Sequence, residues 1–165
     1  MTKPQVISHP LAPVYDENSR ILILGSFPSV KSRQAGFYYG HPQNRFWPLL
    51  ARIFSEKTPQ TVASQQAFLL HHRIAVWDVI APCRIEASAD SSISDVVPND
   101  LYPIFKKADI REIYVNGGTA ARLFHKYQEE KLGRQAIRLP STSPANARWS
   151  FEQLLQAWQI IYSSV

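Results

Sequence analysis

The chain has 165 residues, of which 45% are hydrophobic and 19% charged, and its formal net charge at pH 7 is +5. This composition is typical of one compact domain and excludes a disordered tail or a pair of modules. A single cysteine, Cys83, excludes an internal disulfide, a four-thiolate zinc site and an iron–sulfur cluster held by this chain alone. We interpret Cys83 as a small buried hydrophobic residue.

Neither the hydropathy nor the charge of the chain indicates a membrane role. No apolar run reaches the roughly 18 residues of a membrane span, and the start, MTKPQVISHP, lacks the apolar stretch of a secretion signal. We therefore expect a soluble, cytoplasmic protein. Its positive charge is compatible with a nucleic-acid partner, because lysine and arginine displace counterions from phosphates, but many basic domains bind no anion.

The first predicted strand runs from Arg20 to Gly25, where the unbroken apolar sequence RILILG is typical of a strand buried on both faces of a parallel sheet. It leads into the turn-forming sequence GSFPS. A helix is predicted to begin near Asn44. Its apolar residues recur at helical spacing: Phe46, Trp47, Leu49, Leu50, Ile53 and Phe54.

Strands and helices alternate along the rest of the chain. Further strands are predicted at Ile74 to Val79, Glu112 to Val115 and Gln135 to Leu139. Further helices are predicted at Pro59 to His71, Leu101 to Lys107, Gly117 to about Gln128, and around Phe151, Leu154, Leu155, Trp158 and Ile161. The segment Ala87 to Ser94 is interpreted as a surface loop. This order predicts a single α/β domain, a three-layer α/β/α sandwich with a central, mainly parallel four-stranded sheet.

Each predicted strand ends in small, polar or aromatic residues. The carboxyl ends of parallel strands meet at one edge of an open sheet, where such folds bind their ligands. We therefore expect four segments to form one pocket: GSFPS from Gly25, WDV from Trp77, NGG from Asn116, and LPSTSPAN from Leu139 to Asn146.

These segments, with YYGHPQNRFW at Tyr38 to Trp47, resemble the ordered motifs of the uracil-DNA glycosylase superfamily over nearly the whole chain. The likeness is closest to the hypoxanthine, or deoxyinosine, DNA glycosylases, with the mismatch-specific uracil and thymine glycosylases as near neighbours. The resemblance implies an enzyme of DNA repair that binds DNA containing a deaminated or mismatched base. Such an enzyme flips hypoxanthine or uracil out of the duplex and hydrolyses its N-glycosidic bond, leaving an abasic site.

The resemblance gives Asn44 the main catalytic role, because an amide can orient the attacking water without being protonated at neutral pH. A helix N-cap is an equally plausible role for this asparagine, and both can hold at once. Other branches place Asp or Asn where this chain has Phe27. We therefore assign to Gly25, Ser26 and Phe27 mainly backbone contacts with the base or the water.

Four further residues are predicted to contact the base. Tyr39 is expected to stack on it, with packing in the core as the alternative. Asp78 is expected to accept a hydrogen bond from the ring N–H of hypoxanthine or uracil, with a turn cap as the alternative. Asn116 has a similar but weaker claim. His41 is a secondary candidate for a general acid, although a loop histidine before proline is more often structural.

The segment after the last predicted strand resembles the loop that enters the minor groove in this superfamily. Its residues are Ser141, Thr142, Ser143, Pro144, Ala145 and Asn146. An ordinary surface turn is the alternative. Basic residues that flank the four segments are candidates for phosphate contacts, namely Arg45, Lys31, Arg33, Arg84 and Arg148, with solvated surface charge as the alternative.

We predict no metal and no cofactor, because no H-E-x-x-H or C-x-x-C pattern occurs and we expect His71, His72 and His125 to lack the neighbouring ligands of a metal site. No lysine lies in the four segments except Lys31 at the margin, so a hydrolytic, monofunctional enzyme is expected, acting as a monomer. Two alternatives remain open: a noncatalytic damaged-DNA or nucleotide-binding domain on the same fold, and a small-molecule hydrolase.

Overall fold

The computed structural model describes residues 11–27, 36–81, 84–85, 93–94 and 97–165. A four-stranded sheet with the order β2-β1-β5-β6 lies at its centre. The strands are β1 (Ile21–Gly25), β2 (Ile74–Asp78), β5 (Glu112–Asn116) and β6 (Ile137–Leu139). All three pairings are parallel, so the carboxyl ends of the strands meet at one edge.

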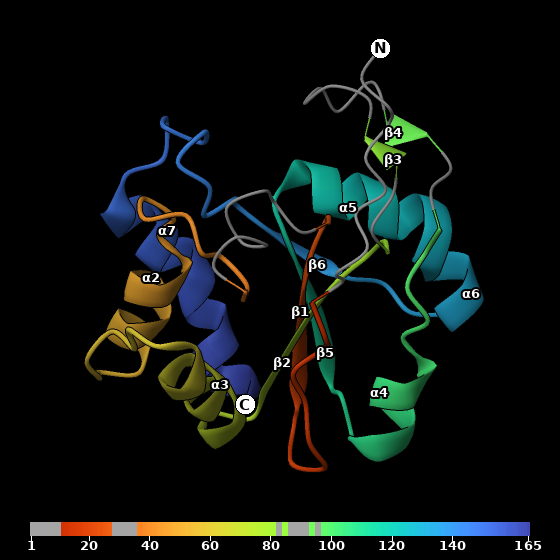
Figure 1. The fold of residues 1–165 in the computed structure, drawn as a ribbon, viewed down its shortest axis with the longest axis horizontal. Helices are drawn as coiled ribbons and strands as arrows, with labels where there is room; N and C mark the ends of the chain where they lie inside the picture. The colour runs from red at the N-terminus through yellow and green to blue at the C-terminus, as the bar shows by residue number, and fades with distance from the viewer. Residues whose placement is uncertain (1–10, 28–35, 82–83, 86–92, 95–96) are drawn as a thin grey trace.

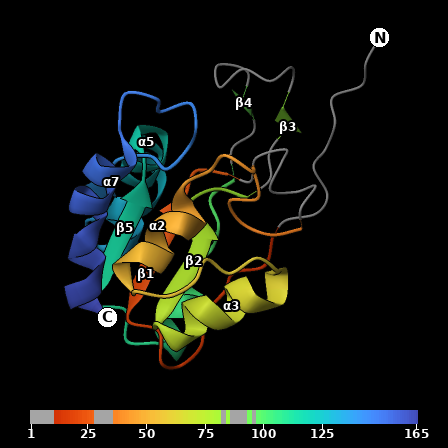
Figure 2. The same cartoon turned by 90° about the vertical axis from the view of Figure 1, so that its left-hand side faces the viewer.

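One face of the sheet is covered by α2 (Phe46–Ile53), α3 (Val62–His71) and α7 (Phe151–Trp158), which continues as the 3₁₀ helix η3 (Gln159–Ser164) (Figures 1 and 2). The other face is covered by α4 (Tyr102–Lys107) and α5 (Gly118–Phe124). Helix α5 continues through the π-helical segment η2 (His125–Glu129) into α6 (Glu130–Leu132). The predicted three-layer α/β/α sandwich is therefore confirmed.

The sequence of β1 explains why two layers of helices are needed. Alternate side chains of a strand point to opposite faces of its sheet. Ile21 and Ile23 belong to the apolar core under α2 and α7, whereas Leu22 and Leu24 belong to the core under α4 and α5. All four residues are fully buried. A strand that is apolar on both faces is stable only between two layers.

Side-chain caps fix the first residues of two helices. Thr61 caps α3 and Ser150 caps α7, each through a reciprocal capping box with the residue three positions later. The helix predicted from Pro59 therefore starts after Thr61. The residue before α2, Arg45, makes no side-chain cap. Instead, the side chain of Asn44 accepts a hydrogen bond from the backbone N–H of Phe46, the first residue of the helix.

Two sequence-based expectations are wrong in detail. The helix predicted to run to about Gln128 is regular only to Phe124, after which the backbone widens into η2. The end of the loop predicted at Ala87 to Ser94 is a short strand, β4 (Ile93–Ser94), paired antiparallel with β3 (Arg84–Ile85). Cys83 lies outside the described residues. Among those residues, no helix combines the length and apolarity needed to cross a lipid bilayer.

Candidate active site

Two predicted site residues, Gly25 and Asp78, are direct neighbours at the ends of β1 and β2. A Cβ atom added to Gly25 would lie 2.6 Å from Oδ1 of Asp78 and 3.4 Å from the hydroxyl oxygen of Tyr39. Only glycine therefore allows the carboxyl group and the phenol to approach the backbone of β1. These three residues, distant in the sequence, form the centre of the candidate site.

Asp78 is the charged residue of this centre. Only 5% of its surface is exposed, and burial raises the pKa of its carboxyl group from 3.8 to about 7. The cause is loss of solvation, which disfavours the ionised form. At neutral pH the carboxyl group can therefore be present in both states. As a carboxylate it accepts hydrogen bonds, and as a protonated acid it can also donate one.

Tyr39 has a left-handed backbone conformation, with φ of 56°. Its ring stacks on Phe46, with 3.9 Å between centroids, so this face of the ring is covered by protein. Its hydroxyl is buried and forms no hydrogen bond of normal geometry with another described residue. Burial and the nearby Asp78 raise the pKa of Tyr39, against a smaller opposing effect of Asn116. The phenol is therefore protonated and has a free hydrogen-bonding capacity.

The neighbouring aromatic residues have structural roles, as the packing interpretation predicted. Phe37 and Tyr38 are both buried in the core under α2. The Tyr38 hydroxyl donates to backbone carbonyls of Leu11 and Ala12, and the Tyr38 carbonyl accepts a hydrogen bond from the Trp47 indole. Tyr39 is thus the aromatic residue of this run that reaches the site.

Asn116, at the end of β5, binds protein instead of presenting a free amide. Its Nδ2 donates to the hydroxyl of Thr142 at 3.0 Å, and its Oδ1 accepts from the backbone N–H of Thr142 at 3.1 Å. Thr142 is fully buried. This geometry makes Asn116 an anchor for the loop after β6, and its predicted contact with the base is not supported by the positions of its bonded atoms.

Arg45 braces the same loop from the other side. Its guanidinium group donates to the backbone carbonyls of Ser143 at 3.0 Å, Asn146 at 2.9 Å and Trp149. Its backbone N–H donates to the carbonyl of Thr142 at 3.0 Å. Three of the five guanidinium N–H groups of Arg45 thus bind loop carbonyls, which gives the residue a structural role; its predicted phosphate contact stays a prediction.

The loop also has internal bonds. The Asn146 amide donates to the carbonyl of Ser141, and the hydroxyls of Ser141 and Ser143 accept from backbone N–H groups two residues later. Gly117 permits the close approach of Ser141, since a Cβ there would lie 3.0 Å from the Ser141 Cβ. The loop is therefore a preorganised projection. Pro144 is partly buried and Ala145 is exposed.

Asn44 has the capping role that the sequence left open. Its Oδ1 accepts from the backbone N–H of Phe46 at 3.0 Å, in the first turn of α2. This bond fixes the amide directly beside Arg45, and hence beside the loop that Arg45 holds. The oxygen retains a second lone pair, so capping and orienting a water are compatible.

His41 has a structural role in the same segment. Its Nδ1 accepts from the backbone N–H of Gln43 at 3.0 Å, and its carbonyl accepts from the backbone N–H of Asn44 at 2.9 Å. These bonds shape the turn before α2, as expected for a loop histidine before proline.

The backbone of the first strand-end segment binds the residues that follow β2. The carbonyls of Gly25 and Ser26 accept from the backbone N–H groups of Val79 and Ile80 at 2.8 and 3.1 Å. The partly buried Phe27 side chain packs against the core under α4 and α5. Lys31 and Arg33 lie outside the described residues, as does the side chain of Arg84, whereas Arg148 is exposed beside the loop.

A buried hydrogen-bond network holds the backbone at Asp78, and the sequence alone does not reveal it. Gln128, fully buried in η2, donates to the carbonyls of Val79 at 3.0 Å and Asn99 at 2.8 Å. The Asn99 amide donates to the Asp78 carbonyl at 2.9 Å. A glutamine in an otherwise amphipathic helix gives little signal by itself. In the structure, Gln128 is distinguished by its place in the π-helical segment η2, because such segments are frequent at functional sites.

The arrangement can bind a planar heterocycle at the carboxyl edge of the sheet. Asp78 and Tyr39 offer hydrogen bonds, and Asn44 stands at the start of α2 beside the braced loop. A chain of contacts through Asn116, Thr142 and Arg45 joins these parts. Gly25 and Asp78 are neighbours, and Asn44 adjoins Arg45, which binds the carbonyl of Ser143. That these four residues line one cavity for a nucleobase stays a prediction.

Comparisons with known proteins identify the family. The profile of the Uracil DNA glycosylase superfamily matches residues 12–161. Hypoxanthine DNA glycosylase of Methanosarcina acetivorans is 36% identical over 152 residues, covering 90% of this chain and 94% of that protein. Hypoxanthine DNA glycosylase of Methanosarcina barkeri is 42% identical over 141 residues, covering 82% of this chain and 86% of that protein.

Solved structures give the same result. The solution NMR structure of a Methanosarcina acetivorans protein assigned to the uracil DNA glycosylases superposes with a TM-score of 0.79 at 34% identity. The match covers 93% of this chain and 94% of that one. The family profile, the relatives and the fold give one answer: the chain belongs to the uracil DNA glycosylase superfamily.

Proposed function

We propose that this protein is a DNA repair glycosylase that hydrolyses the N-glycosidic bond of hypoxanthine flipped out of DNA, leaving an abasic site. The family and two relatives named hypoxanthine DNA glycosylase support this activity. The observation that carries the proposal in the structure is the pair of buried polar groups, Asp78 and Tyr39, at Gly25. Buried polar groups are almost always hydrogen-bonded, so this hydroxyl is available to bind a ligand.

Hypoxanthine has complementary hydrogen-bonding groups. Its ring N1–H is a donor for the Asp78 carboxylate, whereas the N1 of adenine is an acceptor. Its O6 is an acceptor for the Tyr39 hydroxyl, so in this proposal the base meets the edge of Tyr39 instead of stacking on its ring. A buried acceptor left without a donor costs about 1–3 kcal/mol, so the ionised carboxylate discriminates against adenine. Uracil has a similar N–H between two carbonyl groups and is the second substrate we expect.

Asn44 positions the attacking water in this proposal. Its amide is fixed by the bond to the Phe46 N–H, so the water is oriented without rearrangement of the side chain. The chain is expected to leave the abasic site uncleaved, since the described strand-end segments contain no lysine to trap the sugar.

The braced loop, residues 141–146, is the element that we place against the duplex. Insertion of a rigid projection offsets part of the energy lost when a base leaves the stack. The bonds from Arg45 and Asn116 support this role, because they order the loop before DNA binds. We propose that the protein acts on the duplex as a monomer, which gel filtration with and without DNA tests.

The direct test offers duplexes with deoxyinosine, uracil or xanthine opposite each normal base and detects alkali-labile abasic sites. We expect release of hypoxanthine at the highest rate. Two variants separate the roles of Asn44. Asn44→Ser keeps a hydroxyl that can cap α2 and loses the amide, whereas Asn44→Ala loses both.

Loss of base release in both variants, with stability retained in Asn44→Ser, is the expected result. Undiminished release by Asn44→Ala would remove Asn44 from catalysis. Binding of damaged duplex without release of any base would replace the proposed enzyme by a noncatalytic binding domain.

A further inference from the structure

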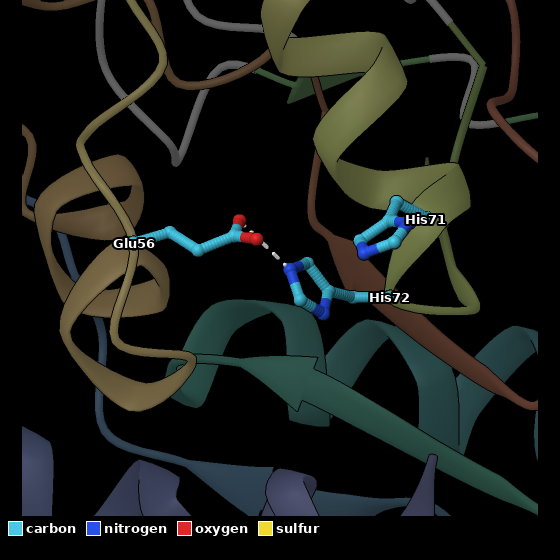
Figure 3. Close-up of side chains that lie close together, drawn as sticks. All are labelled: Glu56, His71 and His72. Atoms are coloured by element: carbon cyan, nitrogen blue, oxygen red, sulfur yellow. Dashed lines mark hydrogen bonds and ion pairs between the residues drawn. The ribbon is translucent and has the colours of Figure 1, made fainter.

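Three potential metal ligands gather at the sheet edge opposite the candidate active site. Glu56 follows α2, His71 is the last residue of α3, and His72 precedes β2. One ligand atom from each lies within 4.8 Å of those of the other two. Figure 3 shows the carboxylate and the two imidazole rings turned toward a common space. The expectation that these histidines lack neighbouring ligands is therefore wrong, because Glu56 comes from a different segment.

The position of His72 is fixed by packing. Its ring stacks on Phe54, with 4.1 Å between centroids, and lies 4.6 Å from the ring of Phe68. Its side chain is 14% exposed, and its Nε2 lies 2.9 Å from Oε2 of Glu56. A ligand held in place in this way loses little conformational entropy when it binds a metal. Glu56 and His71 are exposed, so water can complete the coordination.

The ligand types indicate which ion fits. Two imidazole nitrogens and one carboxylate oxygen suit Zn²⁺ and its neighbours Co²⁺ and Ni²⁺, whereas Ca²⁺ and Mg²⁺ prefer more oxygens. Ligand bonds of about 2.0–2.2 Å place tetrahedral ligand atoms roughly 3.3–3.5 Å apart. Small rotations of the exposed Glu56 and His71 side chains reach this spacing from the observed separations.

A simple ion pair between Glu56 and His72 would not require His71. The His71 ring lies edge-on to that of His72, with 4.8 Å between centroids. His71 is therefore the residue whose removal distinguishes a metal site from an ion pair. With three protein ligands, two of them exposed, the site is open, so we expect weaker binding than at a closed four-ligand structural zinc site.

We propose that Glu56, His71 and His72 form a surface site for a divalent cation of the zinc class, which links the segment after α2 to the start of β2. The ion stabilises the fold, because it binds the folded arrangement of residues sixteen positions apart more tightly than the unfolded chain. It takes no part in base release, since β2 runs from this edge to the opposite one, where Asp78 lies.

The test uses the whole protein, stripped of metal with a chelator and dialysed. Zn²⁺ binding is measured by calorimetry, and Co²⁺ binding by visible absorption. We expect one ion per chain and a higher unfolding temperature with Zn²⁺. His71→Ala should weaken binding at least about tenfold and abolish the thermal shift, because one of three ligands is lost.

His125→Ala is the matched control. It removes another exposed histidine that is paired with a single carboxylate, Glu129, and it should leave Zn²⁺ binding unchanged. The proposal is overturned if the wild-type protein binds no Zn²⁺, or if His71→Ala binds it as tightly as the wild type. Both readouts are independent of glycosylase activity.

Discussion

The Asp78 carboxyl group occupies the space in which any side chain at Gly25 would begin, since a Cβ at Gly25 would lie 2.6 Å from Asp78 Oδ1. This relationship couples the ends of two neighbouring parallel strands. The carboxyl group can reach the site only because β1 ends in glycine. Base binding by Asp78 therefore depends on a glycine at position 25.

Gly25→Ala tests this coupling. The added methyl group must displace Asp78, so we expect a loss of about 1–3 kcal/mol in the free energy of unfolding and a large loss of base release. In an Asp78→Ala background the same change should cost much less, which urea denaturation of the four proteins measures.

Gly133→Ala is the control for this cycle. Gly133, unlike Gly25, has a positive φ, 65°, and has no atom within 4 Å of an added Cβ. Its substitution should cost about 1 kcal/mol through backbone strain alone, with activity retained. Equal costs of Gly25→Ala with and without Asp78 would disprove the coupling.

The pKa of Asp78 predicts how stability depends on pH. Below pH 3.8 the carboxyl group is protonated in both the folded and unfolded states. Between pH 3.8 and about 7 the unfolded chain ionises while the folded protein stays protonated, so the stability contributed by this group falls as pH rises. Above about pH 7 the loss is complete.

Asp78→Asn removes this titration at nearly constant size. Compared with the wild type, the variant should gain stability progressively from about pH 4 to about pH 7, by up to about 4 kcal/mol at about 1.4 kcal/mol per pH unit, and the difference should then stay constant. It should also lose discrimination between inosine and adenosine in DNA, because an amide can donate to the adenine N1. A stability difference that stays constant across this range would exclude a raised pKa.

Tyr39→Phe should separate stability from function. The hydroxyl is buried without a hydrogen bond among the described residues, so its removal should leave stability unchanged or raise it by about 1 kcal/mol. Base release should nevertheless fall, because the hydroxyl is placed to bind the base edge. Tyr38→Phe is the matched control. It removes a hydroxyl bonded to two carbonyls and should destabilise the fold.

Local patterns were sufficient to predict the sheet and most of the helices. The buried run of β1, the apolar spacing of α2 and the polar residues at the strand ends are all properties of short segments. Asp78 was predicted because it ends the second strand, at the place where the enzymes that the chain resembles read the edge of the base. Its proximity to Tyr39 required the sheet register and the left-handed turn at residue 39.

The roles of Arg45 and Gln128 depend on contacts that short segments cannot reveal. The carbonyls that Arg45 binds lie 98 to 104 positions later, and those that Gln128 binds lie 49 and 29 positions earlier. An arginine beside a predicted DNA-binding loop is ambiguous between phosphate and protein partners. Only the folded arrangement decides between them. The neighbours of His71 and His72 were missed for the same reason.

Arg45→Lys tests whether the loop after β6 must be ordered before it binds DNA. A single ammonium group cannot reach three carbonyls that the planar guanidinium binds together. Helix α2 should survive, because the backbone bond of residue 45 to Thr142 remains. We expect faster hydrogen exchange in residues 141–149, a raised KM for duplex substrate and a smaller effect on kcat.

Arg148→Ala provides the contrast, since Arg148 is exposed and charge is its only predicted contribution to binding. It should reduce the salt dependence of DNA binding by about one phosphate contact and leave hydrogen exchange in the loop unchanged. If Arg45→Lys changed only the salt dependence, as Arg148→Ala should, Arg45 would be a phosphate contact after all. If it slowed base release through a raised KM with loop exchange increased, the preorganised loop would be the element that captures the damaged duplex.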